Sequence, residues 1–154
     1  MKNKYLLPLL FTLGISQSHA ESTWIMPTIE SCKANGGEIK KDNLCQAKWE
    51  DAMKICKVSN ATLPSIDRLK NLVTSCGATN VTGSTKDWKS VAGKNNKNTK
   101  YHTCHKKNGF VAYNYWSSSL PTNNEGFAFE INFEYGYQTS TRKNTSLLVK
   151  CVQK

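Results

Sequence analysis

The chain has 154 residues, of which 38% are hydrophobic, and its 21 Lys and Arg against 11 Asp and Glu give a formal net charge of +10 at pH 7. This length corresponds to one domain, and the sequence contains no internal repeat or low-complexity tract, which argues against a repeat architecture. The excess of cations favours anionic partners: acidic or sulfated glycans, lipopolysaccharide, phospholipid head groups or nucleic acid.

Residues 1–20 have the three parts of a secretory signal peptide. Met1–Lys4 is basic, residues 6–15 are an apolar run, and Ser18-His19-Ala20 is a small-residue cleavage site. The alternative is an N-terminal anchor helix, but Pro8 and Gly14 interrupt what would have to be roughly 20 apolar residues. We therefore predict cleavage after Ala20 and an exported protein, periplasmic or extracellular, without a membrane span.

The predicted mature domain, 21–154, keeps most of the positive charge. Loss of Lys2 and Lys4 leaves 19 basic residues against 11 acidic ones, a net charge of +8. The domain holds all six cysteines: Cys32, Cys45, Cys56, Cys76, Cys104 and Cys151. An even number in an exported chain indicates a disulfide framework, for which about 15 connectivities exist. No Cys-x-x-Cys motif is present, which argues against a redox site or a zinc ribbon. Export also argues against nucleic acid as the partner.

The first part of this domain contains turn signals between two cysteines. Residues 21–30 predict an extended segment that can pair as an edge strand. The stretch from Cys32 to Cys45 encloses Asn35-Gly36-Gly37 and Asp42-Asn43, both of which are typical of turns. A cysteine at each end of a short, turn-rich stretch predicts a hairpin closed by a disulfide.

Two amphipathic helices are predicted between residues 49 and 76. In the first, the spacing i, i+3, i+4, i+7 places four apolar residues on one face: Trp49, Ala52, Met53 and Cys56. The second begins at Pro64-Ser65, where the serine hydroxyl can cap the first turn, and ends at Gly77. Its apolar stripe is Ile66, Leu69, Leu72, Val73 and Cys76.

The stretch from Gly77 to Gly109 has almost no apolar content and is predicted to be a long loop, a kind of segment that is often functional or mobile. Its basic and aromatic residues form the candidate ligand-binding set: Lys86, Trp88, Lys89, Lys94, Lys97, Lys100, Tyr101, Lys106 and Lys107. Lysines can reach sulfates or carboxylates along a glycan, and an aromatic ring can stack on a sugar. The alternative interpretation is a solvated loop whose charges only keep it soluble.

Strand patterns dominate the remainder of the chain. Phe110–Trp116 is a strand candidate, 127–133 alternates with period two, 138–145 is polar, and 146–152 reads as a final strand. We interpret Phe127–Phe133 as a buried sheet face. Tyr115-Trp116-Ser117-Ser118-Ser119 is interpreted as core structure rather than as a ligand platform. Helices followed by an antiparallel sheet predict an α+β fold, with two N-terminal helices packed on the sheet.

Several of these residues occur in an order that is known from one family. They are Trp49-x-x-Ala52-x-x-x-Cys56, Leu63-Pro64-Ser65-x-x-x-Leu69, Tyr115-Trp116-Ser117-Ser118-Ser119, Ala128, Gly136 and Val149-Lys150-Cys151-Val152. The ordered set resembles the Lcl C-terminal domain family, named for the adhesive domain of the Legionella collagen-like protein, whose layout is similar to C-type-lectin-like folds. The chain departs from the family pattern at Thr62, Arg68 and Lys150, where arginine, glutamate and arginine are usual. The segment 79–109 has no family motif.

The resemblance implies a disulfide pattern and a function. A bridge from the first helix to the last strand would be Cys56–Cys151, and with Cys32–Cys45 closing the hairpin, Cys76–Cys104 pins the polar region. The named family member binds sulfated polysaccharides, so the resemblance implies a lectin-like adhesin for acidic or sulfated glycans that can oligomerise. The alternative is a periplasmic protein-interaction module for an acidic protein surface, either an immunity or inhibitor protein or a subunit of a pilus or secretion assembly, without glycan binding.

Catalytic and metal-binding patterns are sparse. In His102-Thr103-Cys104-His105 only two imidazoles remain once the cysteine is bridged, too few to hold zinc tightly. Asn123-Asn124-Glu125 has the chemistry that calcium prefers, but we interpret it as a loop tip. No nucleophile elbow or phosphate loop is present, and Glu125, Glu130 and Glu134 lack an evident acidic partner. We predict a protein that is not an enzyme and that needs no cofactor or metal.

Overall fold

The computed structural model describes residues 23–154, and the predicted signal peptide, 1–20, lies outside them. The predicted α+β class is confirmed, but this range contains five α-helices rather than two. The helices are α1 (Ile29–Ala34), α2 (Trp49–Val58), α3 (Ile66–Ser75), α4 (Trp88–Asn96) and α5 (Thr99–Lys107), with a 3-10 turn η1 at Lys41–Asn43. The strands are β1 (Trp24–Ile25), β2 (Glu38–Ile39), β3 (Cys45–Ala47), β4 (Ala61–Thr62), β5 (Asn114–Trp116), β6 (Phe127–Asn132), β7 (Tyr137–Arg142), β8 (Leu147–Leu148) and β9 (Cys151–Gln153).

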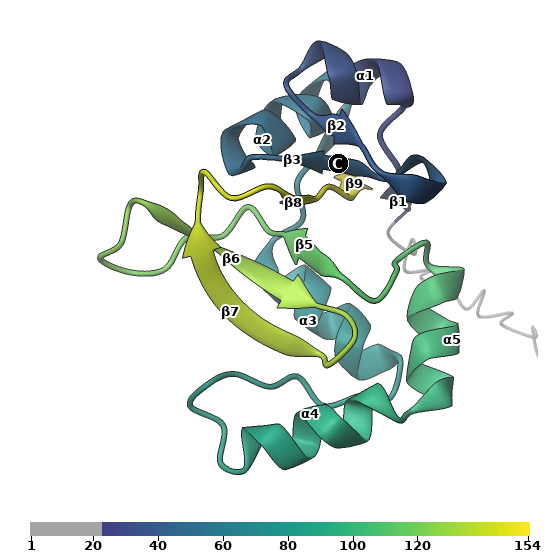
Figure 1. Ribbon diagram of the computed structural model, residues 1–154, viewed down its shortest axis with the longest axis vertical. Coiled ribbons are helices and arrows are strands. Elements are labelled where there is room, and N and C mark those ends of the chain that lie inside the picture. The colour runs from purple at the N-terminus through teal and green to yellow at the C-terminus, as the bar shows by residue number, and fades with distance from the viewer. Residues whose placement is uncertain (1–22) are drawn as a thin grey trace, which may run out of the picture.

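The strands form two sheets, ordered β1-β9-β4 and β2-β3-β8-β5-β6-β7. Neighbouring strands pair antiparallel except for β5 and β8, which are parallel. Helix α3 lies behind β5, β6 and β7, whereas α1 and α2 gather at one end of the molecule and α4 and α5 at the other (Figure 1). Within residues 23–154, no helix has the length and apolar character that a membrane span requires.

The core has two parts, and β5 contributes to both. Trp116 is fully buried in a cluster that includes Ala128. The preceding residue, Tyr115, packs with Leu69 of α3 and Ile131 of β6 in the second cluster. Adjacent side chains of a strand point to opposite faces of a sheet, so β5 separates the two clusters. The predicted structural role of this aromatic motif is confirmed.

Three disulfides join the cysteines in the pairing that the resemblance implied: Cys32–Cys45, Cys56–Cys151 and Cys76–Cys104. Cys56–Cys151 ties α2 to β9 within the first core cluster. The predicted role of the first bridge is wrong in detail. Cys32 lies in α1, so this disulfide ties a helix to β3 instead of closing the ends of a hairpin.

The N-terminal segment is extended only at its start. Trp24 and Ile25 pair with β9, as an edge strand should, but Thr28 then begins α1 because its hydroxyl accepts a hydrogen bond from the Ser31 amide at 3.0 Å. The predicted turn at Asp42 and Asn43 is confirmed: both residues have positive φ, 61° and 59°. Asp and Asn tolerate this conformation, which a tight hairpin turn requires.

The two predicted helices correspond to α2 and α3. Ser65 caps α3 by accepting from the Arg68 amide at 3.3 Å, and Gly77, with φ 86°, follows its end as predicted. The predicted stripe of α3 is buried throughout. In α2 the stripe is wrong at Met53, which is 37% exposed, whereas Ile55 is fully buried. Helix positions that flank an apolar stripe are the least certain from spacing alone.

The C-terminal strands differ from the prediction in extent. The segment predicted to be only polar contains β7, which pairs with β6 over six consecutive residue pairs. The predicted final strand is divided into β8 and β9, which belong to different sheets. The strand predicted at 110–116 is shortened to β5, because the Phe110 amide still donates to the His105 carbonyl at 3.0 Å at the end of α5.

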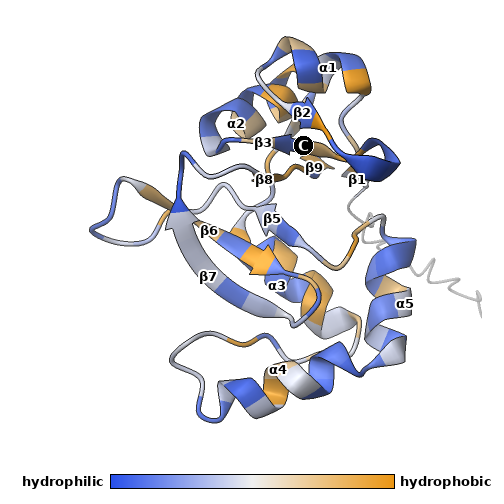
Figure 2. Cartoon of the chain, viewed as in Figure 1, coloured by the Kyte–Doolittle hydropathy of each residue, from blue (hydrophilic) through white to orange (hydrophobic). Residues whose placement is uncertain are grey.

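The long loop predicted at 77–109 is wrong, because α4 and α5 occupy most of it. Figure 2 shows both helices mostly hydrophilic, with few apolar positions. Only Ala92 and Asn95 of α4 and Tyr101 and His105 of α5 are buried. The helices therefore depend on tertiary hydrogen bonds and a disulfide rather than on an apolar stripe, which explains why the hydrophobic pattern did not predict them.

Candidate functional site

The predicted basic residues are carried by α4, α5 and their flanking turns, and all of them are exposed. We call this set the lysine cluster: Lys86, Lys89, Lys94, Lys97, Lys100, Lys106 and Lys107. The three ion pairs present in residues 23–154 all lie elsewhere, so no lysine of the cluster has a carboxylate within 4.0 Å in that range. Cations without partners of their own leave their charge available to an anionic ligand.

Asn95 fixes α4 to the rest of the fold. Its Nδ2 donates to the carbonyls of Thr79, at 2.7 Å, and Tyr135, at 2.8 Å, and its Oδ1 accepts from the Thr79 amide at 3.1 Å. Nearby, the Val81 amide donates to the Gly136 carbonyl at 3.0 Å. One buried amide side chain thus connects the helix to the turn between β6 and β7.

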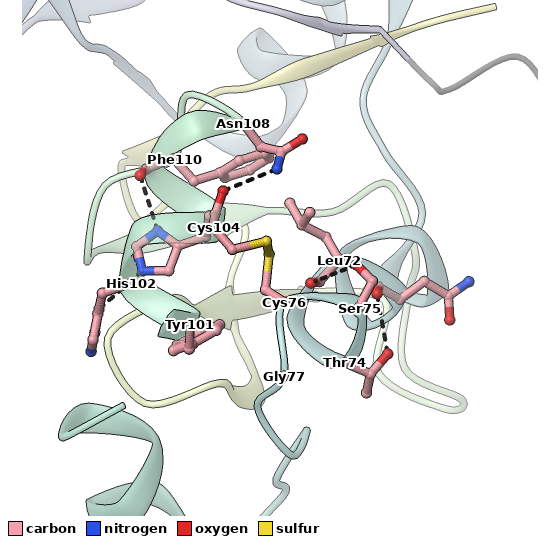
Figure 3. Close-up of a disulfide and its surroundings, with 12 residues drawn as sticks. Leu72, Thr74, Ser75, Cys76, Gly77, Tyr101, His102, Cys104, Asn108 and Phe110 are labelled. Atoms are coloured by element: carbon pink, nitrogen blue, oxygen red, sulfur yellow. Dashed lines mark hydrogen bonds between the residues drawn. A yellow bond between two sulfur atoms is a disulfide. The ribbon is translucent and has the colours of Figure 1, made fainter. Parts of the chain in front are cut away.

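Helix α5 is anchored by aromatic packing and by a disulfide. Asn98 begins it by accepting from the Tyr101 amide at 3.0 Å, and Cys104 bonds to Cys76 just beyond α3 (Figure 3). The Tyr101 ring is fully buried, 4.8 Å from the His105 ring. Burial also raises the pKa of the Tyr101 phenol, which keeps the hydroxyl protonated. The prediction that Tyr101 contacts ligand is therefore wrong, because its ring belongs to the core.

A depression of about 420 Å³ lies along the exposed side of α5. It is lined by Thr99, Lys100, Thr103, Cys104, Lys107 and Asn108. The spacing of these residues places them on one helical face, with the Thr103 hydroxyl between the two lysines. Two cations and neutral hydrogen-bond donors in one concavity suit a sulfate or a carboxylate. Of the predicted basic residues, Lys100 and Lys107 are the two that line this depression.

Thr103 and Asn108 were missed by the sequence reasoning. The signal was present, because Lys100, Thr103 and Lys107 stand at i, i+3 and i+7. The stretch 77–109 was interpreted as a loop, however, and helical spacing places residues on a common face only if the stretch is a helix. Asn108 is also held in place, since its Nδ2 donates to the Cys104 carbonyl at 3.0 Å (Figure 3).

Trp88 lies at the start of α4, away from this depression. Its ring is half-buried and packs 5.2 Å from the ring of Tyr137 in β7, and Lys89 Nζ lies 5.7 Å from the indole centroid. Contact with Tyr137 fixes the orientation of the indole, and one part of the ring remains accessible. Trp88 is therefore a structural contact of β7, and Lys89 Nζ lies over its ring.

The two histidines of α5 contact each other. His102 Nδ1 and His105 Nε2 are 3.0 Å apart, and His105 Nδ1 is 3.1 Å from the Phe110 carbonyl oxygen. Burial lowers the pKa of His105. Among residues 23–154 no three His, Cys, Asp or Glu side chains are grouped in a way that could hold a metal ion. The pair thus helps to hold the end of α5.

In comparisons with known proteins, no family model matches the chain, and no curated protein matches it either. The resemblance to the Lcl C-terminal domain family stays a prediction.

Proposed function

We propose that this protein is an exported binding domain of lectin-like layout whose lysine cluster binds acidic or sulfated glycans. The observation that carries the proposal is the depression on α5, where Lys100 and Lys107 flank the Thr103 hydroxyl. The resemblance to the Lcl C-terminal domain family supports the same class of ligand. Three disulfides are consistent with an oxidising compartment outside the cytoplasm.

The geometry favours a chain of anionic groups over a single anion. The lysines are spread over two helices, so separate sulfates or carboxylates of one polymer can pair with separate side chains. Each exposed pair contributes only about 0.2–1 kcal/mol, so useful affinity requires several of them. The interaction should therefore weaken strongly as salt is raised.

Heparin serves as the probe. We expect the mature domain to be retained on a heparin column, and the double variant Lys100→Glu/Lys107→Glu to elute at markedly lower salt. The matched control is Lys33→Glu/Lys48→Glu, which changes the net charge equally at exposed positions of α1 and before α2. Thr103→Val removes the central hydroxyl without changing the charge, and we expect it to elute earlier than wild type as well.

Two results would refute the proposal. One is retention of wild type no greater than that of a neutral protein of similar size. The other is an equal loss of retention in the variant and in its control, which would mean that only net charge matters. Blank glycan arrays together with one stoichiometric co-purifying protein would instead favour the alternative, a protein-interaction module.

A further inference from the structure

A groove of about 780 Å³ lies where α2, β4 and the first turn of α3 meet the end of β9. We call it the α2–β4 groove. Its volume falls within the range of ligand-binding clefts, about 300–1,000 Å³. None of the residues in the lysine cluster lines it. It is therefore a second candidate site, separate from the depression on α5.

The groove has an apolar floor. Leu63 and Val152 are buried there, and Met53 of α2 lines the groove while 37% exposed. Methionine is flexible and adapts to apolar partners of different shape. Covering exposed apolar surface contributes favourably to binding, because it removes that surface from water. A ligand that places an apolar side chain against Met53 would gain this contribution.

The rim of the groove is cationic. Lys57 and Arg68 line it, together with Lys154, and no Asp or Glu side chain does. Neither Lys57 nor Arg68 has a carboxylate within 4.0 Å in the described part of the chain. The guanidinium group can bind a carboxylate through two parallel hydrogen bonds. The groove is thus complementary to an acidic ligand.

The edge of a sheet borders the same groove. In the order β1-β9-β4, strand β4 is the outer strand, so its outer side has no strand neighbour among residues 23–154. An extended peptide can pair with such an edge through its backbone. An acyl chain has no polar groups to offer this edge, so the edge favours a peptide over an anionic lipid. Because β4 has only two residues, we expect this edge mainly to set the register of the bound peptide. The cationic rim and the apolar floor of the groove then provide most of the affinity.

We propose that the α2–β4 groove binds an extended acidic peptide segment of a partner protein. A carboxylate of the peptide pairs with Arg68 or Lys57, and an apolar side chain covers Met53. This site is independent of the lysine cluster and of the proposed glycan binding.

The probe is a fluorescein-labelled synthetic peptide of alternating glutamate and leucine, and the measurement is fluorescence anisotropy with the mature domain. We expect Lys57→Glu/Arg68→Glu to weaken binding at least about tenfold, which corresponds to about 1.4 kcal/mol, and Met53→Asp to weaken it as well. The control Lys33→Glu/Lys48→Glu has the same net charge, lies outside both candidate sites and should bind the peptide as wild type does. All substituted side chains are exposed, and circular dichroism checks that each variant folds.

Several outcomes would overturn the proposal. They are the absence of binding at about 1 mM peptide, an equal loss in the control variant, and unchanged binding of a peptide with serine in place of leucine. Vesicles of anionic phospholipid that bind through Lys57 and Arg68, while the peptide does not, would assign the groove to a lipid instead. The heparin experiment depends on Lys100 and Lys107, so either proposal can fail while the other holds.

Discussion

Asn95→Ala tests whether one buried amide holds α4 in place. The side chain makes three hydrogen bonds, two with the backbone of Thr79 and one with the Tyr135 carbonyl. A hydrogen bond contributes about 0.5–1.5 kcal/mol net, so the loss of three lowers the free energy of unfolding by about 1.5–4.5 kcal/mol. The higher helix propensity of alanine offsets about 0.5 kcal/mol of this loss.

The matched control is Asn96→Ala. Asn96 is the next residue of the same helix, is exposed, and its side chain has no hydrogen bond among residues 23–154, so the propensity change is equal and the tertiary loss is absent. Urea unfolding followed by tryptophan fluorescence gives the difference between the variants, which we expect to be about 1.5–4.5 kcal/mol. Amide exchange should show that Asn95→Ala first exposes the amides of α4. If the free energies of unfolding of the two variants agree within about 0.5 kcal/mol, the side chain of Asn95 does not hold α4 in place.

Two further predictions concern the second anchor of the site and a buried acid. Removing the Cys76–Cys104 bridge with alanines should lower the free energy of unfolding by about 3.6 kcal/mol, because the bridge spans 28 residues of chain. In hydrogen exchange, the amides of α5 should lose protection while those of β6 keep it. Burial raises the pKa of Glu130 above 4.5, so its charged form destabilises the fold above that raised pKa. At pH 7, Glu130→Gln should therefore unfold at a higher temperature than wild type, with a free energy of unfolding that is higher by roughly 1 kcal/mol. The gain should disappear as the pH falls below about 4.5, and a gain that is constant with pH, or that also occurs in the exposed control Glu125→Gln, would contradict this.

The elements that the sequence predicts well are those whose packing repeats along the chain. The apolar stripe of α3 continues for three turns and has a serine cap before it and a glycine after it, so both ends and the buried face could be read locally. Trp116 was also predicted from a short local motif, and its ring and that of Tyr115 are buried on opposite faces of β5. In each case one local pattern is sufficient because its apolar side chains meet large apolar clusters.

Helices α4 and α5 could not be predicted in this way, because neither has an apolar stripe. The hydrogen bonds of Asn95 hold α4, and the buried Tyr101 ring and a disulfide hold α5. The partners of Asn95, Thr79 and Tyr135, are separated from it by 16 and 40 residues. Nothing in the local composition distinguishes a buried asparagine from an exposed one. The structure places the predicted basic residues at exposed positions in and around these helices, whereas Tyr101, which was predicted to contact ligand, has its ring in the core.

The α2–β4 groove was missed for a different reason. Met53 satisfies the helical spacing of a core residue, but it is 37% exposed and lines a groove that is formed in part by the placement of β4 beside β9. That placement joins residues about 90 positions apart, as the Thr62 hydroxyl donating to the Val152 carbonyl at 3.4 Å illustrates. Contacts of such long range are not visible in a local pattern.

The two cationic surfaces differ in how firmly the fold holds them. The groove is built on α2 and β9, which Cys56–Cys151 joins inside a core cluster, whereas the depression on α5 depends on Cys76–Cys104 and a few buried side chains. Helices α2 and α5 lie toward opposite ends of the molecule (Figure 1), and exposed charges are screened beyond about 8 Å at physiological salt. A polymer bound at one end therefore has little electrostatic effect on a peptide bound at the other. Under the two proposals, the same separation would let one small domain bind an anionic polymer and a peptide segment at the same time.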